Sequence, residues 1–336
     1  MATAFPLNAD IVRLVIRQAA DEIERSTSHS PVDAFYQRSA LLRRLALVNS
    51  RWRPLAQLEL ESYVVLTSRN FSLVSHRLEQ QDRLARRVRR LVDRRGTTRE
   101  QKQLDDVLAK CEGLRELDCK NTRFSLNSLL GMKLLDTLSL SNVALAGTAE
   151  HLVLPCRLRS FTLSGTCEVT RSDWRALKGT GTSSLEHLEL VGRITSDPAS
   201  LVDTLSAWLP SVRSLEMADI FFSTSLIPCL NRCQRLERLA IKLLDLPAAI
   251  AVLDCSPRQL EIVASSEVLD NWTFEDYQSN VLWAVGKEPL DQVESVKVSR
   301  APGIYDSVGS REVALLVKIG RRKQRGSIPP GKRSRA

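Results

Sequence analysis

Apolar residues recur in short blocks along most of the chain, at the first, fourth and sixth positions of each block. The clear blocks begin at Leu114, Leu135, Leu158, Leu185, Val212 and Leu236. Weaker copies begin at Pro257 and Val293, and an early one at Val88 carries Asp93 where the third apolar residue is expected. From Val88 onward the blocks are 26, 21, 23, 27, 27, 24, 21 and 36 residues apart. This near-regular step indicates a repeat architecture.

Each block is predicted to be a short strand, because its fourth and sixth residues fall on the same side of an extended chain. One strand cannot bury that side alone, so the strands are expected to stack in parallel around a shared core. Residues 99–111 and 198–209 have the apolar spacing of helices that could close this core. The blocks and steps resemble leucine-rich repeats. That resemblance implies an α/β solenoid with a parallel β-sheet on its concave side and helices on its convex side.

The first part of the chain does not share this period. Residues 7–20 predict a helix that Asn8 caps and whose first turn contains Asp10. A polar loop over 25–33 is expected next, followed by a helix over 39–56 that ends near Pro54. The apolar residues expected to form one face of each helix are Ile11, Leu14 and Val15 in the first, and Leu45, Val48, Trp52 and Leu55 in the second.

These features resemble the F-box. That motif opens with Leu-Pro-x-Glu-Ile, which Leu7-Asn8-Ala9-Asp10-Ile11 approximates, with Asn8 at the usual proline position and Pro6 before it. It closes with Val-x-x-x-Trp and a Leu-Ala pair, matched by Val48 to Trp52 and by Leu55-Ala56. Residues 58–68 are similar to the strand that follows the F-box in this family.

The resemblance implies a non-catalytic substrate receptor of a cullin–RING ubiquitin ligase. In that family the F-box binds a Skp-type adaptor, which links it to the cullin core, and the repeats capture an as yet unidentified protein substrate. The expected adaptor-binding residues are Pro6, Leu7, Ile11, Leu14, Val15, Leu45, Val48, Trp52 and Leu55. Two alternatives stay open: Trp52 packs on the first repeat, and the chain is a ligase-independent repeat scaffold.

The side of each strand that faces away from the core is the candidate target-binding face. Its expected members are Glu116, Asp118, Ser139, Thr162, His187, Glu189, Glu216, Arg238 and Lys242. They run from acidic through hydroxyl-bearing to acidic and then basic, which suits a polar partner of mixed charge. The alternative is that small hydroxyl residues simply fit crowded strands while the charges stay solvated.

The formal charge of +9 is concentrated in two segments. Residues 77–95 hold eight arginines and three acids, and 321–335 hold seven bases and no acid, so these segments carry +5 and +7 and the remainder −3. Arg86, Arg87, Arg89 and Arg90 are expected to form a solvated flank of a capping repeat. Nucleic-acid binding is the weaker reading, because no aromatic residues are interleaved with them. The tail resembles a bipartite nuclear import signal or is a solubilising tail.

Composition and motifs bear on the cellular location of the chain and on whether it is an enzyme or binds a metal. With 43% hydrophobic and 26% charged residues, no apolar run of bilayer length and no secretory-type start, the chain is expected to be cytoplasmic, nuclear or both, without a membrane partner. Seven scattered cysteines indicate a reducing compartment and packing roles. No catalytic or phosphate-binding motif is present, and Cys229 and Cys233 have no second pair of ligands, so no enzyme activity, metal or cofactor is expected.

The expected domain organisation follows from these readings. An F-box-like helical domain spans 1–58 and a leucine-rich-repeat solenoid spans 59–300. A C-terminal cap or last strand spans 301–320, and a disordered basic tail spans 321–336.

Overall fold

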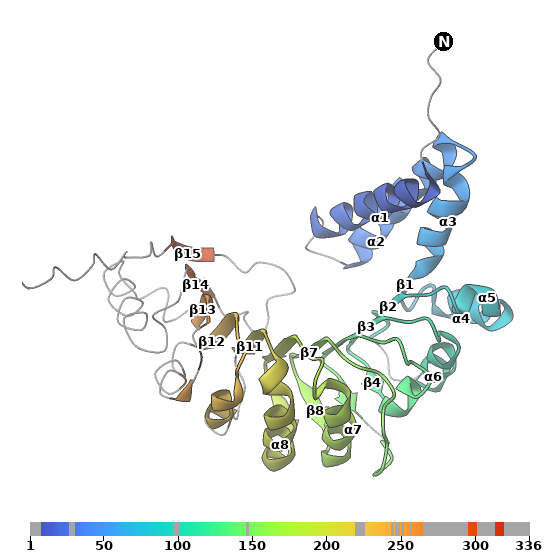
Figure 1. The fold of residues 1–336 in the computed structure, drawn as a ribbon. Helices are drawn as coiled ribbons and strands as arrows, with labels where there is room; N and C mark the ends of the chain where they lie inside the picture. Colours follow the sequence, from blue (N-terminus) through green and yellow to red (C-terminus); the bar gives the residue numbers. More distant parts are fainter. Residues whose placement is uncertain are drawn as a thin grey trace, which may run out of the picture.

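The computed structural model describes residues 8–26, 31–96, 101–145, 148–218, 226–242, 257–264, 295–300 and 313–318 (Figure 1). Between 243 and 256 it describes Asp245, Ala249, Val252, Leu253 and Cys255. Within these residues the chain is an α/β protein with one large, mainly parallel sheet and helices. Pro6, Leu7 and the tail expected at 321–336 lie outside the described residues, and of the cap expected at 301–320 only a strand over 313–318 is described.

Three helices form the N-terminal part, here called the helical unit: α1 (Ala9–Ser26), α2 (Pro31–Val48) and α3 (Trp52–Ser62). Asn8 caps α1 as predicted, because its Oδ1 accepts a hydrogen bond from the N–H of Asp10 at 3.0 Å. The helices share a small core of Val12, Ile16, Ala20, Leu42 and Ala56. No helix among the described residues is long and apolar enough to cross a bilayer.

The structure corrects the predicted helix over 39–56. The chain leaves helical form at 49–51, so Val48 ends α2 and Trp52 begins α3. Asn49 makes this break, since its Oδ1 accepts a hydrogen bond from the N–H of Arg51 at 2.8 Å. Pro54 lies in the first turn of α3, where its missing N–H costs nothing, and does not end a helix. Helix α2 also begins at Pro31, inside the segment predicted as a polar loop.

Every apolar block forms a strand, as the sequence predicts. The strands of the large sheet are β1 (Tyr63–Leu66), β2 (Arg90–Asp93), β3 (Glu116–Lys120), β5 (Thr137–Ser141), β7 (Ser160–Ser164), β9 (His187–Val191), β11 (Ser214–Ala218), β12 (Arg238–Lys242), β13 (Gln259–Ala264), β14 (Ser295–Arg300) and β15 (Val313–Lys318). They lie side by side in this order. All neighbours are parallel except β14 and β15, which are antiparallel.

The strands follow an arc, and the register keeps equivalent residues of each block side by side (Figure 1). Leu117, Leu138, Phe161 and Leu188 are adjacent in this register and are buried in one continuous core. The predicted alternation is therefore confirmed, because the fourth and sixth residues of each clear block point into the core.

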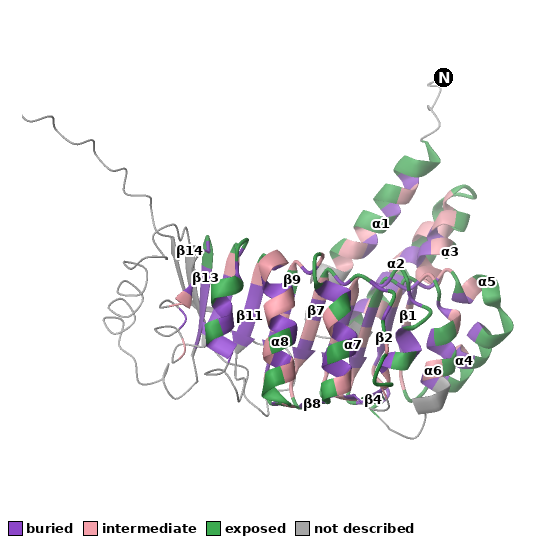
Figure 2. Ribbon diagram, turned by 60° about the horizontal axis from the view of Figure 1, so that its bottom comes forward, coloured by how far each residue is buried: buried purple, intermediate pink, exposed green. Residues whose placement is uncertain are grey.

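The outer side of the arc is built from short strands and helices. A second parallel sheet has the order β10 (Ile194–Ser196), β8 (Cys167–Val169), β6 (Ala144–Leu145) and β4 (Arg123–Phe124). The helices are α4 (Phe71–Gln80), α5 (Asp82–Ala85), α6 (Gln101–Lys110), α7 (Arg171–Gly181) and α8 (Pro198–Trp208). Helices α7 and α8 lie side by side along the sheet (Figure 2). Helical turns at η1 (Leu126–Leu129) and η3 (Ile227–Arg232) take the place of full helices in two other repeats, and η2 (Leu209–Ser211) continues directly from α8.

Tight turns after the central strands connect the two sheets. Asn121 (φ 54°), Asn142 (φ 51°), Gly165 (φ 73°) and Gly192 (φ 102°) hold left-handed conformations there, which asparagine and glycine tolerate best. The Nδ2 of Asn142 donates to Asn121 Oδ1 at 3.0 Å, and its own Oδ1 accepts from the N–H of Thr166 at 2.8 Å. These side chains link successive repeats across the turn.

The cysteines pack into the core as expected. Cys111, Cys119, Cys156, Cys167, Cys229 and Cys233 are buried, and Cys255 is partly buried. Burial raises the pKa of Cys111 and Cys233 to about 12 and that of Cys156 to about 11. These thiols are therefore protonated at neutral pH and behave as small apolar groups.

Helix α2 packs directly on the first strands of the sheet. Phe35 contacts a cluster of Tyr63, Val65 and Val92, which are outward-facing residues of β1 and β2. The Phe35 and Tyr63 rings meet edge to face with centroids 5.4 Å apart, and the guanidinium groups of Arg38 and Arg90 lie 5.4 and 4.8 Å from the Tyr63 centroid. The helical unit thus covers the start of the face that is open over the later strands.

Of the four arginines predicted to form a solvated flank, Arg86 and Arg89 are exposed, whereas Arg87 and Arg90 are partly buried. The arginine-rich segment contains β2, and several of its side chains are paired: Arg87 with Glu61, Arg90 with Glu116, and Arg94 with Asp118. Arg95 is fully buried, 2.8 Å from Asp93, and lies over the Phe71 ring. Arg95 needs its pairing with Asp93, because an unpaired buried charge is strongly destabilising.

Candidate functional site

The outward side of the large sheet is the inner, concave side of the arc. One row across it, set by strand register, contains Asp118, Ser139, Thr162, Glu189 and Glu216. The preceding row contains Glu116, Thr137, Ser160, His187, Ser214, Arg238 and Gln259. Eight of the nine sequence-derived candidates therefore lie on one surface, in two neighbouring rows, and Lys242 lies one row farther along β12.

At the start of this face, the two acidic candidates have basic partners within the chain. Asp118 accepts two hydrogen bonds from Arg94, at 3.0 and 2.6 Å. Glu116 lies 3.3 Å from Arg90, and both of these side chains are substantially exposed. The bidentate Arg94–Asp118 pair is held more firmly than the exposed Arg90–Glu116 pair.

Small hydroxyl side chains occupy the middle of the face. Ser139, with Thr137 and Ser141, lies on β5, and Thr162, with Ser160 and Ser164, lies on β7. The Ser141 and Ser164 hydroxyls are 2.7 Å apart, and the Thr162 hydroxyl donates to Glu189 at 3.4 Å. All six are partly exposed. Short side chains and surface hydroxyls favour contact with a polar partner surface.

Farther along, the structure corrects the expectation for Glu216. Its residue is only 5% exposed, so it does not stand out as a solvated contact. Arg238 lies beside it, with Nη2 3.5 Å from Glu216 and 2.6 Å from Glu261, which is also buried. The sequence pattern did not predict that Glu216 is buried, because its burial depends on side chains of neighbouring strands such as Arg238. For Lys242 the structure places the backbone in β12, and its side chain lies outside the described atoms.

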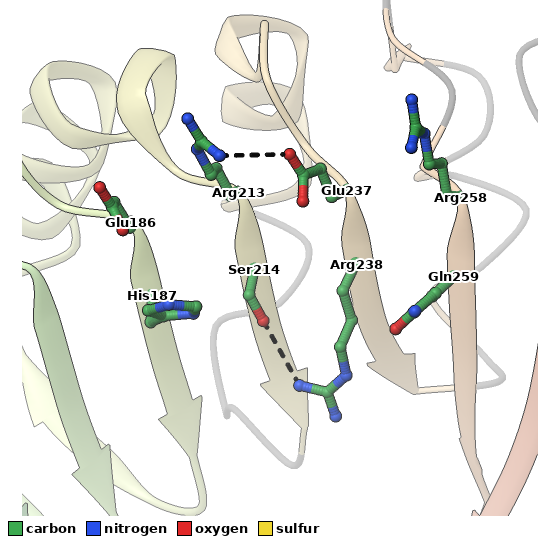
Figure 3. Close-up of a pocket in the computed structure, with 8 residues that line it drawn as sticks. All are labelled: Glu186, His187, Arg213, Ser214, Glu237, Arg238, Arg258 and Gln259. Atoms are coloured by element: carbon green, nitrogen blue, oxygen red, sulfur yellow. Dashed lines mark hydrogen bonds and ion pairs between the residues drawn. The ribbon is translucent and has the colours of Figure 1, made fainter. Parts of the chain in front are cut away.

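A pocket of about 470 Å³ lies where β9, β11, β12 and β13 begin (Figure 3). Its lining combines His187, Ser214, Arg238 and Gln259 with the residues directly before them, Glu186, Arg213, Glu237 and Arg258. Arg213 and Glu237 are 3.5 Å apart, and both are more than half exposed. His187 and Arg238 are thus brought together in one pocket, whereas the other four lining charges were not among the predicted site residues.

The expected adaptor-binding residues divide into two groups. Ile11, Leu14, Val15 and Val48 are exposed, at 49%, 64%, 47% and 67%. Leu45, Trp52 and Leu55 are partly buried against the core of the helical unit. Trp52 therefore packs within its own unit and not on the first repeat, and much of its surface serves that packing.

Two exposed apolar residues of the helical unit were missed. Leu47 is 86% exposed and Tyr36 is 61% exposed, both on α2. Leu47 directly precedes Val48 at the end of α2, so the two form one apolar tip. The signal in the sequence was the run of apolar residues over 45–48, which is too long for one buried helical stripe.

Within the part of the chain that the structure describes, no group of three or more histidine, cysteine, aspartate or glutamate side chains has the arrangement of a metal site. The described surfaces present exposed apolar groups on the helical unit and mixed charges with hydroxyls on the sheet. No model of a known protein family matches the sequence, and a search of curated proteins finds no match.

Proposed function

We propose that this chain is the substrate receptor of a cullin–RING ubiquitin ligase, of the F-box and leucine-rich-repeat type. In this proposal the helical unit binds a Skp-type adaptor, and the concave face of the sheet binds a protein target. The observation that carries the proposal is the set of large apolar side chains that the helical unit leaves in solvent: Ile11, Leu14, Val15, Leu47 and Val48.

These side chains support an interface because the chain itself does not cover them. The helical unit has its own small core, yet it leaves Ile11, Leu14 and Val15 exposed near the start of α1, and Leu47 and Val48 exposed at the end of α2. Clustered exposed apolar side chains on a protein surface mark interaction sites more often than chance solvent exposure. An F-box that binds an adaptor would use such a surface. The helical unit resembles the F-box in the order of its motif residues, from Leu7–Ile11 to Val48–Trp52.

The repeat geometry supports the second half of the proposal. Successive strands begin two residues after the first apolar position of each block, which is the arrangement expected of leucine-rich repeats. The open part of the concave face presents polar and charged groups to solvent. Such a face suits recognition of a folded or extended polar protein surface.

In this role the protein itself breaks and forms no covalent bond. It raises the local concentration of a target lysine near the ubiquitin-loaded conjugating enzyme. The packing of Phe35 on Tyr63 and Val65 gives this mechanism a physical basis, because it fixes the helical unit against the sheet. A fixed geometry restricts where a bound target can sit relative to the adaptor.

Binding to a purified Skp-type adaptor tests the proposal. We expect the full chain to bind, and the double variant Leu14→Asp/Leu47→Asp to bind at least about tenfold more weakly, because both changes place a charge on the apolar surface. The matched control is Leu73→Asp, since Leu73 is 74% exposed but lies on α4, away from the helical unit. Calorimetry measures the affinity, and thermal unfolding checks that each variant folds.

Two results would contradict the proposal. One is a folded wild-type chain that does not bind the adaptor, which would favour a ligase-independent repeat scaffold. The other is undiminished binding by the double variant. Point variants are preferable to deleting residues 1–58, because Phe35 covers Tyr63, Val65 and Val92 and its loss would expose them.

A further inference from the structure

In the large sheet, the residue just before each strand from β3 to β13 carries a charge, and the sign of that charge alternates from one strand to the next. The order is Arg115, Asp136, Arg159, Glu186, Arg213, Glu237 and Arg258, here called the charge ladder. Arg89, before β2, is basic like Arg115, so the alternation starts at β3.

The backbone places these residues directly beside one another. The N–H of Asp136 donates to Arg115 O at 2.9 Å, that of Arg159 to Asp136 O at 2.7 Å, and that of Glu186 to Arg159 O at 2.8 Å. The same bond joins Arg213 to Glu186 at 2.8 Å and Glu237 to Arg213 at 2.7 Å. Neighbouring members are therefore one strand spacing apart, about 4.8 Å.

Most of these charges stay available to a partner. Among the described residues, the only ion pair between ladder members is Arg213–Glu237, at 3.5 Å, and its side chains are 51% and 61% exposed. All four arginines and Glu237 are exposed, and Asp136 and Glu186 are partly exposed. Figure 3 shows Glu186, Arg213, Glu237 and Arg258 in a row at the rim of the pocket. Opposite charges side by side ease strand stacking, yet they leave the side chains largely in solvent.

The alternation restricts the chemistry of a partner. A polyanion such as nucleic acid would be repelled by a carboxylate at every second position of the ladder. A polycation would be repelled by a guanidinium group at the positions between. An extended peptide presents same-side residues about 6.7 Å apart, so its charges would fall out of step with a spacing of about 4.8 Å. A partner that fits needs alternating charges at the spacing of parallel strands. A second copy of this chain has that pattern.

Symmetry makes the ladder complementary to itself. A twofold axis that passes between two neighbouring members reverses the order, so each member meets one of opposite sign. With the axis between Glu186 and Arg213, Glu186 faces Arg213, Arg159 faces Glu237, and Asp136 faces Arg258 of the second copy. An arc maps onto itself under such an axis, so the curvature of the sheet does not break the match. With the axis between Arg159 and Glu186 instead, Arg258 would face Arg89 of the second copy, which has the same charge.

We propose that the chain forms a symmetric dimer through the charge ladder, with the twofold axis between Glu186 and Arg213. The dimer does not depend on the proposed ligase function. Because the pairs are exposed, the association is weak, with a Kd on the order of 10⁻⁴ M at low salt. Screening makes it sensitive to ionic strength.

Sedimentation of the full chain at about 10–300 µM tests the proposal, since this range brackets the expected Kd. We expect a monomer–dimer equilibrium in 50 mM sodium chloride that weakens at least about tenfold in 500 mM. Glu186→Arg and Arg213→Glu should each leave the chain monomeric, because each places like charges across the axis twice. The double variant Glu186→Arg/Arg213→Glu should restore the dimer, since each new side chain faces the other.

Controls separate this effect from net charge and from misfolding. Lys133→Glu and Glu150→Arg change the charge equally at exposed positions outside the ladder, so they should dimerise like the wild type. Thermal unfolding of every variant shows whether it folds. A wild-type chain that is monomeric in 50 mM salt, single variants that still dimerise, or a folded double variant that is not restored would each overturn the proposal. A failure to fold by a single variant leaves the wild-type salt dependence and the double variant to decide.

Discussion

In the helical unit large apolar side chains point both inward and outward, whereas those of the central strands β3, β5 and β7 all point into one core. Val12 and Ile16 are buried on α1 while Leu14 and Val15, on the same helix, are exposed. In the sheet, Leu117, Leu138 and Leu188 are buried at equivalent positions and the intervening residues are polar. Each repeat buries its apolar side chains against the neighbouring repeats. The three helices of the helical unit are too few to bury all of theirs.

The largest expected effect comes from shortening a core residue of the sheet. Leu188→Ala should lower the free energy of unfolding by about 2–5 kcal/mol, because Leu188 is 1% exposed in the continuous core. Leu14→Ala should change it by no more than about 0.5 kcal/mol, because Leu14 is 64% exposed. Denaturant titration of both variants measures the difference. If both variants lost the same free energy of unfolding, Leu14 would be as important to the core as Leu188, contrary to this comparison.

An intermediate effect is expected where the two regions meet. Phe35→Ala should lower the free energy of unfolding by about 1–2 kcal/mol, because it removes the edge-to-face contact with Tyr63 and uncovers Val65 and Val92. Hydrogen exchange should rise in α2, β1 and β2 and stay unchanged in β7 and β9. Leu73→Ala is the control, since Leu73 is 74% exposed and lies on α4. Unchanged exchange in β1 would mean that the helical unit does not hold these strands.

The smallest expected effect is a change in pH dependence at the same junction. Partial burial raises the pKa of Glu61, but hydrogen bonds from Gln57 and Arg87 outweigh it, so the pKa lies below its usual 4.5. A lowered pKa in the folded state stabilises the fold above the unfolded pKa, and this stabilisation disappears as pH falls through the folded value.

Glu61→Gln should therefore lower the free energy of unfolding at pH 7 by less than about 1 kcal/mol and flatten its decline between about pH 5 and 3. Chemical denaturation at several pH values measures this. Glu79→Gln, at an exposed position on α4, serves as the control. A decline as steep in Glu61→Gln as in the wild type would show that the Arg87 contact does not influence the carboxyl group.

The strands could be read from the sequence because their pattern is local. Each block, including the weak ones at Pro257 and Val293, begins a strand two residues later. The break between α2 and α3 could not be read from the sequence, because the apolar spacing continues through it as in a single helix. The break depends on the Asn49 side chain, whose Oδ1 accepts a hydrogen bond from the N–H of Arg51. Propensity and spacing describe a helix well but do not predict where a side chain ends it.

The candidate surfaces were predictable only in part. The outward direction of Glu116, Ser139 and Thr162 followed from alternation alone. The burial of Glu216 beside Arg238, and the pairing of Arg94 with Asp118, depend on which residues lie across the neighbouring strand. Such contacts are set by packing between segments far apart in sequence, which periodicity does not report.

The regular stacking of β1 to β15 has a mechanical consequence. Eleven strands give ten steps of about 4.8 Å each, so a path of about 48 Å along the arc separates the two edges. Helix α2 packs on one edge of the sheet, and the distance from that edge to the other depends on the number of repeats. This distance can therefore change only in steps of one strand spacing. Gain or loss of one repeat would shift everything beyond it by a single increment and leave the chemistry of each end intact.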